Sequence, residues 1–177
     1  MKQTEGRDTV TWIGQMTTLL RLDGRTILTD PWLTDHASPM GSWGPKRYVP
    51  PALGFDDLPA IDFVVISHSH YDHLDLPTIG RLPGRERITA VVPLGLGGYF
   101  RDSGYGRVVE LDWEQSTTVD GMKFTALPVI HWSKRSPFAT NDTLWAGFAI
   151  ESSAYLLGSL VALVRATRTA RNFRDRS

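Results

Sequence analysis

The chain has 177 residues, enough for one compact domain with a hydrophobic core. Its 19 Lys and Arg residues balance 19 Asp and Glu residues, so the overall charge recruits neither nucleic acid nor an acidic membrane surface. Cysteine is absent, which excludes disulfides, thiolate catalysis and thiolate metal ligands and leaves imidazole and carboxylate as the strong metal ligands.

No apolar run is long enough to be a signal peptide at the N-terminus or a membrane span elsewhere. The longest run, AYLLGSLVALV over residues 154–164, is too short to cross a bilayer. We therefore expect a cytoplasmic protein.

The first third of the chain predicts an antiparallel start to a β-sheet. Short β-rich runs cover residues 9–14, 17–22 and 25–30, and Asp23-Gly24 between the last two is a strong hairpin signal. Residues 32–60 are rich in Pro, Gly and Ser and predict a long loop, a feature that often carries function.

The middle of the chain predicts a buried strand followed by a helix. The run IDFVVIS over residues 61–67 is continuously apolar, as in strands covered on both faces, and residues 73–82 have apolar positions at helical spacing. A turn is expected at residues 119–121. Four more strands are predicted, at residues 88–93, 106–113, 122–132 and 144–152.

The stretch ISHSHYDHLD, directly after the buried strand, contains three of the chain's five histidines and spells HxHxDH. Side chains two residues apart in an extended backbone point the same way, so His68 and His70 can hold one metal ion together. Asp72 and His73 follow and can serve a neighbouring position. This set suits one or two zinc ions, and two metals about 3.5–4 Å apart can clamp a phosphoester or acyl centre. The alternative is an inert polar loop.

Two further histidines compete for the remaining ligand position. His131 ends another apolar run, LPVIH, and we predict it as the third ligand, because a tetrahedral site on two histidines lacks one. His36 lies in the predicted loop beside no other ligand-type histidine, and we leave it out of the site.

The HxHxDH motif after a buried strand resembles the metallo-β-lactamase superfamily of metal-dependent hydrolases. Further stretches occur in an order similar to the N-acylphosphatidylethanolamine-hydrolysing phospholipase D group, and the resemblance covers residues 10 to 151. They are TWIG, ILTDPW, GPKRYVPP, VPLGL, ELDW, HWSKR and NDTLWAGF.

The resemblance implies an α+β fold, the αββα sandwich of that superfamily, of which the chain would contain the N-terminal half to two-thirds. It also implies that His68, His70 and His131 hold one zinc ion, while Asp72 and His73 belong to a second. A metal-bound water would then hydrolyse a phosphodiester. Asp30, in the motif TDP, would orient a histidine, although an ordinary Asp-Pro turn explains it as well.

The chain departs from the family pattern at two places. Gln15 stands where members often have a histidine after WIG. The Gly-Asp-Thr-Gly-like segment with its metal-bridging aspartate, and the final histidine, are not found after Ser153. We therefore divide the chain into a partial domain over residues 1–153 and an Arg-rich tail over 154–177, and interpret the chain as a truncated or frameshifted product. Half a sandwich is expected to expose an apolar sheet face.

Three functions follow as hypotheses. The first is a zinc-dependent phosphodiesterase that acts on a phospholipid and touches the membrane peripherally through aromatic and basic residues of the loop from Trp32 to Leu53. The second is a fragment that binds one zinc without turnover. The third is another hydrolase of the same fold, such as a sugar-phosphate lactonase. The neutral charge argues against a nucleic-acid substrate.

Overall fold

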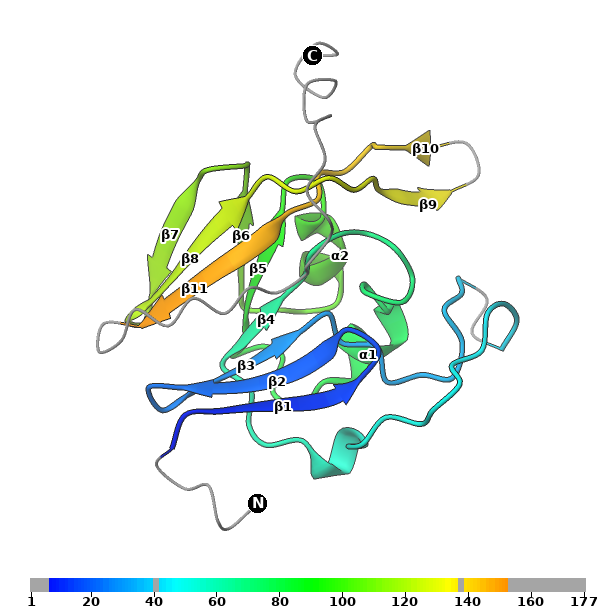
Figure 1. The fold of residues 1–177 in the computed structure, drawn as a ribbon, viewed down its shortest axis with the longest axis horizontal. Coiled ribbons are helices and arrows are strands. Elements are labelled where there is room, and N and C mark those ends of the chain that lie inside the picture. Colours follow the sequence, from blue (N-terminus) through cyan, green and yellow to red (C-terminus); the bar gives the residue numbers. More distant parts are fainter. Residues whose placement is uncertain (1–6, 40–41, 137–138, 153–177) are drawn as a thin grey trace.

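The structure, a computed structural model, describes residues 7–39, 42–136 and 139–152, and within them it has two β-sheets and a separate hairpin (Figure 1). The larger sheet has six strands in the order β1-β2-β3-β4-β5-β6. Its first three strands pair antiparallel and its last four pair parallel. These strands are β1 (Thr9–Gly14), β2 (Thr17–Leu22), β3 (Arg25–Thr29), β4 (Phe63–Val65), β5 (Thr89–Pro93) and β6 (Arg107–Leu111).

The smaller sheet has three antiparallel strands in the order β11-β8-β7. A two-stranded hairpin lies apart from it at one end of the molecule (Figure 1). The sheet consists of β7 (Ser116–Val119), β8 (Met122–Leu127) and β11 (Gly147–Ser152), and the hairpin of β9 (Lys134–Ser136) and β10 (Ala139–Thr140).

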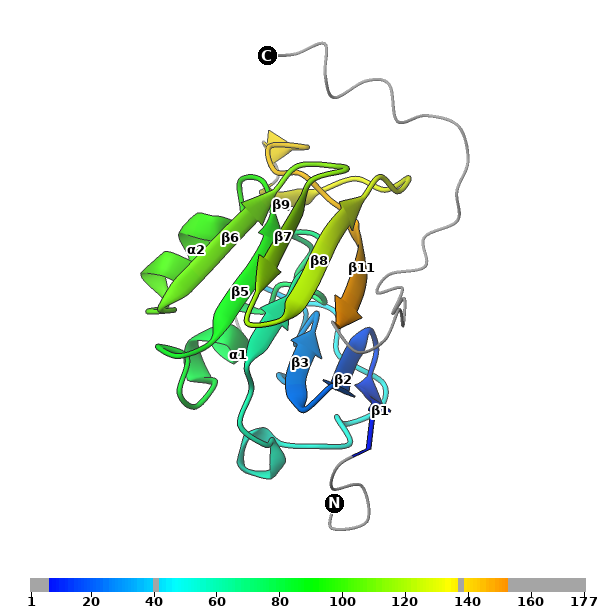
Figure 2. The same ribbon diagram turned by 90° about the vertical axis from the view of Figure 1, so that its left-hand side faces the viewer.

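Two short helices cover the face of the larger sheet that lies away from the smaller one (Figure 2). They are α1 (Leu76–Arg81) and α2 (Gly97–Asp102), and a 3₁₀ turn covers Phe55–Asp57. Among the described helices, none is long and apolar enough to cross a membrane.

Each face of the larger sheet has its own hydrophobic core, and β4 contributes to both. Phe63 and Val65 belong to the core between the two sheets, whereas Val64 and Ile66 belong to the core under the helices. This alternation follows from the period of two in a strand, and it explains why the run is continuously apolar. Between the sheets, Phe63 packs against Phe124 of β8 with ring centroids 5.0 Å apart.

Both predicted tight turns are present, and in both the backbone takes the left-handed conformation. Asp23 and Gly24 have φ angles of 50° and 73°, and Asp120 and Gly121 have 48° and 82°. Two successive positive φ values give the turn that best matches the twist of a hairpin, and Gly adopts them without steric cost.

Several predicted boundaries are wrong. The expected helix over 73–82 is shorter because its first three residues belong to the histidine loop and Pro83 forces Leu82 into an extended conformation. The expected strand 122–132 stops at Leu127, since Pro128 cannot donate to the ladder. The run 106–113 gives only β6, and β7 and α2 were not predicted as elements.

The expectation of an apolar outer face is wrong for the described strands of the smaller sheet. Along β8 the buried residues alternate with Lys123 and Thr125, which point away from the core. Lys123 pairs with Glu151 on β11 at 2.9 Å and lies opposite Thr118 on β7. The predicted tail, 154–177, lies outside the described residues.

The contact between the two sheets gives a first prediction. Phe124→Ala removes a side chain with 0% exposure and should lower the free energy of unfolding by about 3–5 kcal/mol. The neighbouring Lys123→Ala, which faces solvent, should change it by less than about 0.5 kcal/mol. Urea unfolding of both variants measures the difference, and equal values would show that the two sheets do not share a core.

Candidate metal centre

The HxHxDH segment forms a tight loop at the carboxyl end of β4. The amides of His73 and Leu74 both donate to the carbonyl of His70, at 3.0 and 2.8 Å. Leu74 then enters the core under the helices with 0% exposure, and Asp75 begins α1. The loop is therefore anchored by β4 before it and by a buried leucine after it.

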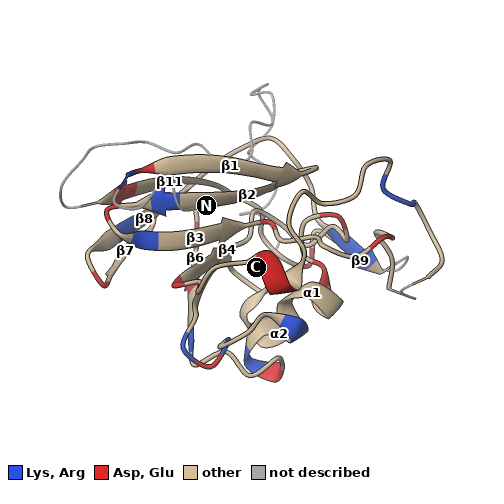
Figure 3. Cartoon of the chain, turned by 90° about the horizontal axis from the view of Figure 1, so that it is seen from below, with Lys and Arg blue, Asp and Glu red and all other residues tan. Residues whose placement is uncertain are grey.

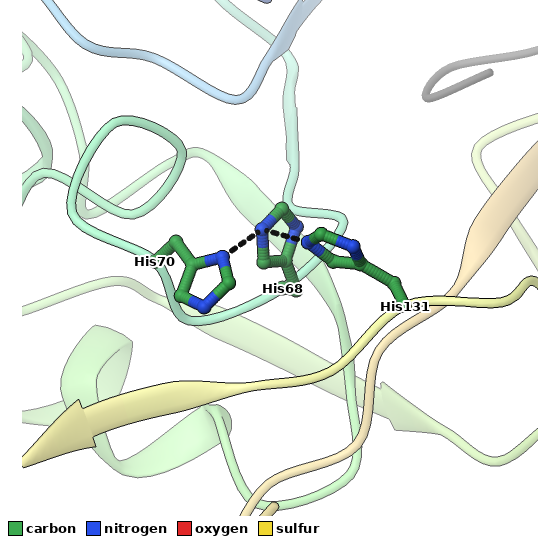
Figure 4. Close-up of side chains that lie close together, drawn as sticks. All are labelled: His68, His70 and His131. Atoms are coloured by element: carbon green, nitrogen blue, oxygen red, sulfur yellow. Dashed lines mark hydrogen bonds between the residues drawn. The ribbon is translucent and has the colours of Figure 1, made fainter. Parts of the chain in front are cut away.

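Three imidazoles from two distant segments meet at this loop. Nε2 of His68 lies 2.8 Å from Nδ1 of His70 and 2.9 Å from Nε2 of His131 (Figure 4). His131 comes from the segment between β8 and β9. The three candidate ligand atoms all lie within 4.8 Å of one another.

The donor set fits a divalent metal better than a hydrogen-bonded cluster. One ring nitrogen of a neutral imidazole carries at most one hydrogen, so Nε2 of His68 cannot donate to both partners at once. Tetrahedral zinc with Zn–N bonds of about 2.0–2.1 Å places its ligand nitrogens about 3.3 Å apart, close to the spacing observed here. The three nitrogens are therefore close enough together to hold one metal ion.

The three rings are kept in the neutral state that metal binding requires. Burial lowers the pKa of His68 far below its ordinary value, and the neighbouring His73, His131 and His70 lower it further. Burial is also the largest cause of the lowered pKa of His70 and of His131. Neutral imidazoles leave their lone pairs available for a cation.

A buried aspartate at the end of β3 organises the loop from below. The carboxylate of Asp30, with 0% exposure, accepts hydrogen bonds from the amide and the hydroxyl of Ser67, both at 2.7 Å. It also lies 2.9 Å from Nδ1 of His73. The Ser67 hydroxyl in turn lies 2.9 Å from Nδ1 of His68. Asp30 therefore contacts a histidine of the motif, as the resemblance implied, and is more than a residue of an Asp-Pro turn.

Asp72 and His73 lie beside the triad and face each other. Nε2 of His73 is 3.7 Å from Oδ2 of Asp72. Burial lowers the pKa of His73, but the charge and hydrogen bond of Asp30 and the charge of Asp72 outweigh it, so the net shift is upward. The amide of Gln15 donates to Oδ2 of Asp72 at 3.3 Å, so this residue reaches the site despite replacing a histidine.

The remaining candidate, His36, lies away from the triad. Its backbone forms a bridge with Lys46 inside the long loop, and it is absent from the group that could hold a metal. Among the described residues, Asp72 and His73 are the two members of the motif that lie beside the triad without belonging to it.

A cavity of about 710 Å³ opens beside His70 and Asp72. Its walls are largely apolar and include several aromatic rings, and Lys46 and Arg47 are its cationic residues. Trp132 packs edge-on against His70 with ring centroids 4.4 Å apart, which fixes that imidazole on its outer side. The aromatic residues that line the cavity are Trp12, Trp32, Tyr48, Tyr71 and Trp132.

Sequence reasoning missed two residues that contact the loop, Ser67 and Arg135. Ser67 directly precedes the motif, and this adjacency is the only sign of its role. Arg135 is part of the motif HWSKR, but nothing in the motif says that its guanidinium reaches the carbonyls of Ser69 and Leu74, both at 2.7 Å.

Comparison with known proteins defines the family. Residues 25–168 match the family described as beta-lactamase superfamily domain. This is more than half of the chain, so the chain belongs to the metallo-β-lactamase superfamily of hydrolases, and both the predicted fold class and the resemblance are confirmed.

Two curated relatives cover a similar part of the chain. An uncharacterized protein of Mycobacterium tuberculosis is 46% identical over 142 residues, 79% of this chain and 38% of the relative. The N-acyl-phosphatidylethanolamine-hydrolyzing phospholipase D 1 of Caenorhabditis elegans is 39% identical over 150 residues, 79% of this chain and 42% of the relative. The chain thus spans about two fifths of the length of these relatives.

A solved structure also resembles the chain. It is CmlA, a diiron beta-hydroxylase from Streptomyces venezuelae, with a TM-score of 0.59 and 28% sequence identity, and the match covers 82% of this chain and 27% of CmlA. A protein with a similar fold over this part of the chain thus holds two iron ions.

The hydrogen bonds of Asp30 lead to a second prediction. Asp30→Asn keeps the shape and tolerates the φ of 40° at this position, but it removes the charge that faces His73. Metal affinity should fall about 10–100-fold, as is typical when a group that orients a ligand is lost. Competition with a chromophoric chelator measures the affinity.

The matched control is Asp23→Asn, which changes an aspartate of similar backbone conformation, φ 50°, in the turn between β2 and β3. Its metal affinity should equal that of the parent. An unchanged affinity in Asp30→Asn as well would mean that the carboxylate does not act on the ligands.

Proposed function

We propose that the chain is the metal-binding part of a phosphodiesterase that acts on phospholipids, with N-acylphosphatidylethanolamine as the substrate class. The observation that carries the proposal is that His70 of the triad, with Asp72, lines a large, mainly apolar cavity whose wall also includes Lys46 and Arg47. The name of the Caenorhabditis elegans relative supports the choice of substrate.

His68, His70 and His131 would hold one ion, which we propose to be zinc, and Asp72 and His73 would contribute to a second position. When bound, zinc lowers the pKa of a coordinated water and offsets charge on the phosphoryl oxygens. The residues of the chain do the rest: Ser67 and Asp30 fix the orientation of the rings, and Gln15 holds the carboxylate of Asp72.

The cavity wall favours an anionic substrate. Arg47 is held in place because its guanidinium lies 4.6 Å from the centre of the Trp32 ring and Nη1 donates to the Trp32 carbonyl at 3.1 Å. With Lys46 it gives the cavity two positive charges, against one acid in the lining, Asp72. A phosphodiester with an uncharged head group matches this balance better than a zwitterionic one with a free amine.

The rim of the cavity supports peripheral contact with a membrane. Tyr48 and Trp43 of the long loop are 103% and 75% exposed, so they do not pack the loop onto the sheet. Trp12 of β1 and Val49 are also exposed and line the cavity. Aromatic side chains beside Lys46 suit the boundary between lipid head groups and acyl chains.

A second candidate function, a protein that binds one metal without turnover, is favoured by a specific observation. The described residues direct three nitrogens at one metal position and only two side chains at the other. Two-metal hydrolysis needs both positions. The metal count therefore separates the two functions, and iron remains an alternative to zinc because CmlA is a diiron protein.

The test of the proposed function is metal content per purified chain, by elemental mass spectrometry, together with hydrolysis of bis(p-nitrophenyl) phosphate. Two metals with turnover support the phosphodiesterase, and one metal without turnover supports the binding protein. His68→Ala should abolish tight metal binding, whereas His36→Ala should retain it. Full metal content in His68→Ala would place the ligands elsewhere.

The exposed rim gives a further prediction. Replacing Trp43 and Tyr48 together by Ala should reduce co-sedimentation with vesicles of phosphatidylcholine and N-acylphosphatidylethanolamine by about tenfold or more, because aromatic side chains that bury in lipid contribute roughly 1.5–3 kcal/mol each. Leu94→Ala, at a 41% exposed site that does not line the cavity, is the control. Equal pelleting of all three proteins would exclude this rim as the contact surface.

A further inference from the structure

The ligands of the triad come from two segments that are far apart in the chain, and the three imidazoles cannot hold the segments together by themselves. His68 and His70 follow β4, whereas His131 precedes β9. Without a metal, at most one hydrogen bond links each pair of rings, and one hydrogen bond between two side chains does not fix the distance between their backbones. Some other group must fix the distance between the segments.

Arg135, on β9, bridges them. Its Nη1 donates to the carbonyls of Ser69 and Leu74, each at 2.7 Å. Nη1 of a guanidinium has two hydrogens, so each carbonyl receives its own. Ser69 lies between His68 and His70, and Leu74 ends the loop, so one side chain spans the loop from its first ligands to its last residue.

Tyr71, in the same loop, contacts Arg135 in turn. Its ring lies under the guanidinium of Arg135, 4.4 Å from the ring centre, and its hydroxyl donates to the Arg135 carbonyl at 2.5 Å. The guanidinium also lies 5.3 Å from the ring of Tyr99, which belongs to α2. Two aromatic rings thus contact the guanidinium, and these contacts hold its direction independently of any metal.

We propose that Arg135 is a positioning residue that locks the histidine loop to the segment bearing His131, and so preforms the metal site. The inference rests on the proposed metal site, but it concerns how that site is held and not what it hydrolyses. The basic strand β9, visible in Figure 3, then has a role inside the protein, because the Arg135 guanidinium is directed at the loop.

The geometry requires arginine specifically. A lysine ammonium is a point charge without a plane, so it cannot stack on Tyr71 while donating to two carbonyls in fixed directions. Lys134, the preceding residue, lines a cavity of about 340 Å³ beside the loop together with Arg135. A positive charge at position 135 without the planar guanidinium would therefore not replace the contacts of Arg135.

The test uses Arg135→Lys and Arg135→Met in the full chain, with zinc affinity measured by chelator competition and the ligand-field spectrum recorded after cobalt substitution. We expect zinc affinity to fall about 10–100-fold in both variants and the cobalt bands to shift or weaken. Arg85→Lys is the matched control, because Arg85 also donates to a backbone carbonyl, that of Ser103 at 2.6 Å, away from the site. It should bind like the parent.

Tyr71→Phe keeps the ring and removes only the hydroxyl, so it tests the bridge even if the Arg135 variants do not fold. A few-fold loss of zinc affinity is expected. Absence of zinc binding in the parent would overturn the metal site itself. Parent-like affinity and cobalt spectra in folded Arg135→Lys, or in Tyr71→Phe if neither Arg135 variant folds, would overturn the role of Arg135 while leaving the metal site intact.

Discussion

The site depends on one buried carboxylate. Asp30 follows β3, and β3 runs parallel to β4 with Thr29 opposite Val65, so the two strands end at the same edge of the sheet. This register brings Asp30 against Ser67, the residue from which the histidine loop starts. A carboxylate with 0% exposure is costly unless its oxygens are paired, and here they accept from the amide and hydroxyl of Ser67 and contact His73. The fold and the site therefore share the same hydrogen bonds.

The cluster brings the ring nitrogens of three neutral imidazoles together, and this links stability to metal binding. Burial disfavours protonation of His68, His70 and His131, while their nitrogens approach to 2.8 and 2.9 Å. A metal bound at this position would replace competing lone pairs by bonds. Because the unfolded chain lacks such a site, binding there would stabilise the folded state.

Much of the site could be predicted from local pattern. The position of His68 and His70 directly after an apolar run, and the end of a second apolar run at His131, were enough to predict that these three histidines lie together. The contacts of Arg135 with Ser69 and Leu74, and of Gln15 with Asp72, could not be predicted, because they join segments whose approach is set by tertiary packing. The predicted ends of helices and strands were wrong where a proline or the histidine loop interrupted an apolar pattern, as after Leu127.

The motif NDTLWAGF is one of the stretches on which the resemblance to the phospholipase D group was based. The structure shows what two of its residues contact. The indole of Trp145 donates to the carbonyl of Val129 at 2.9 Å, two residues before His131. The amide of Ala146 donates to the carbonyl of Ser67 at 2.9 Å, one residue before His68. The motif thus contacts both ligand-bearing segments on the core side.

Arg135 contacts the same loop nearer the surface. The two segments that carry the histidines are therefore held together at two places. The inner contacts come from the small sheet, whose position depends on the packing of Phe124 against Phe63. A change in that core would therefore be transmitted to His131 through Trp145 and Val129, although none of these residues touches a metal. Geometry at the site is in this sense a consequence of how the two sheets pack.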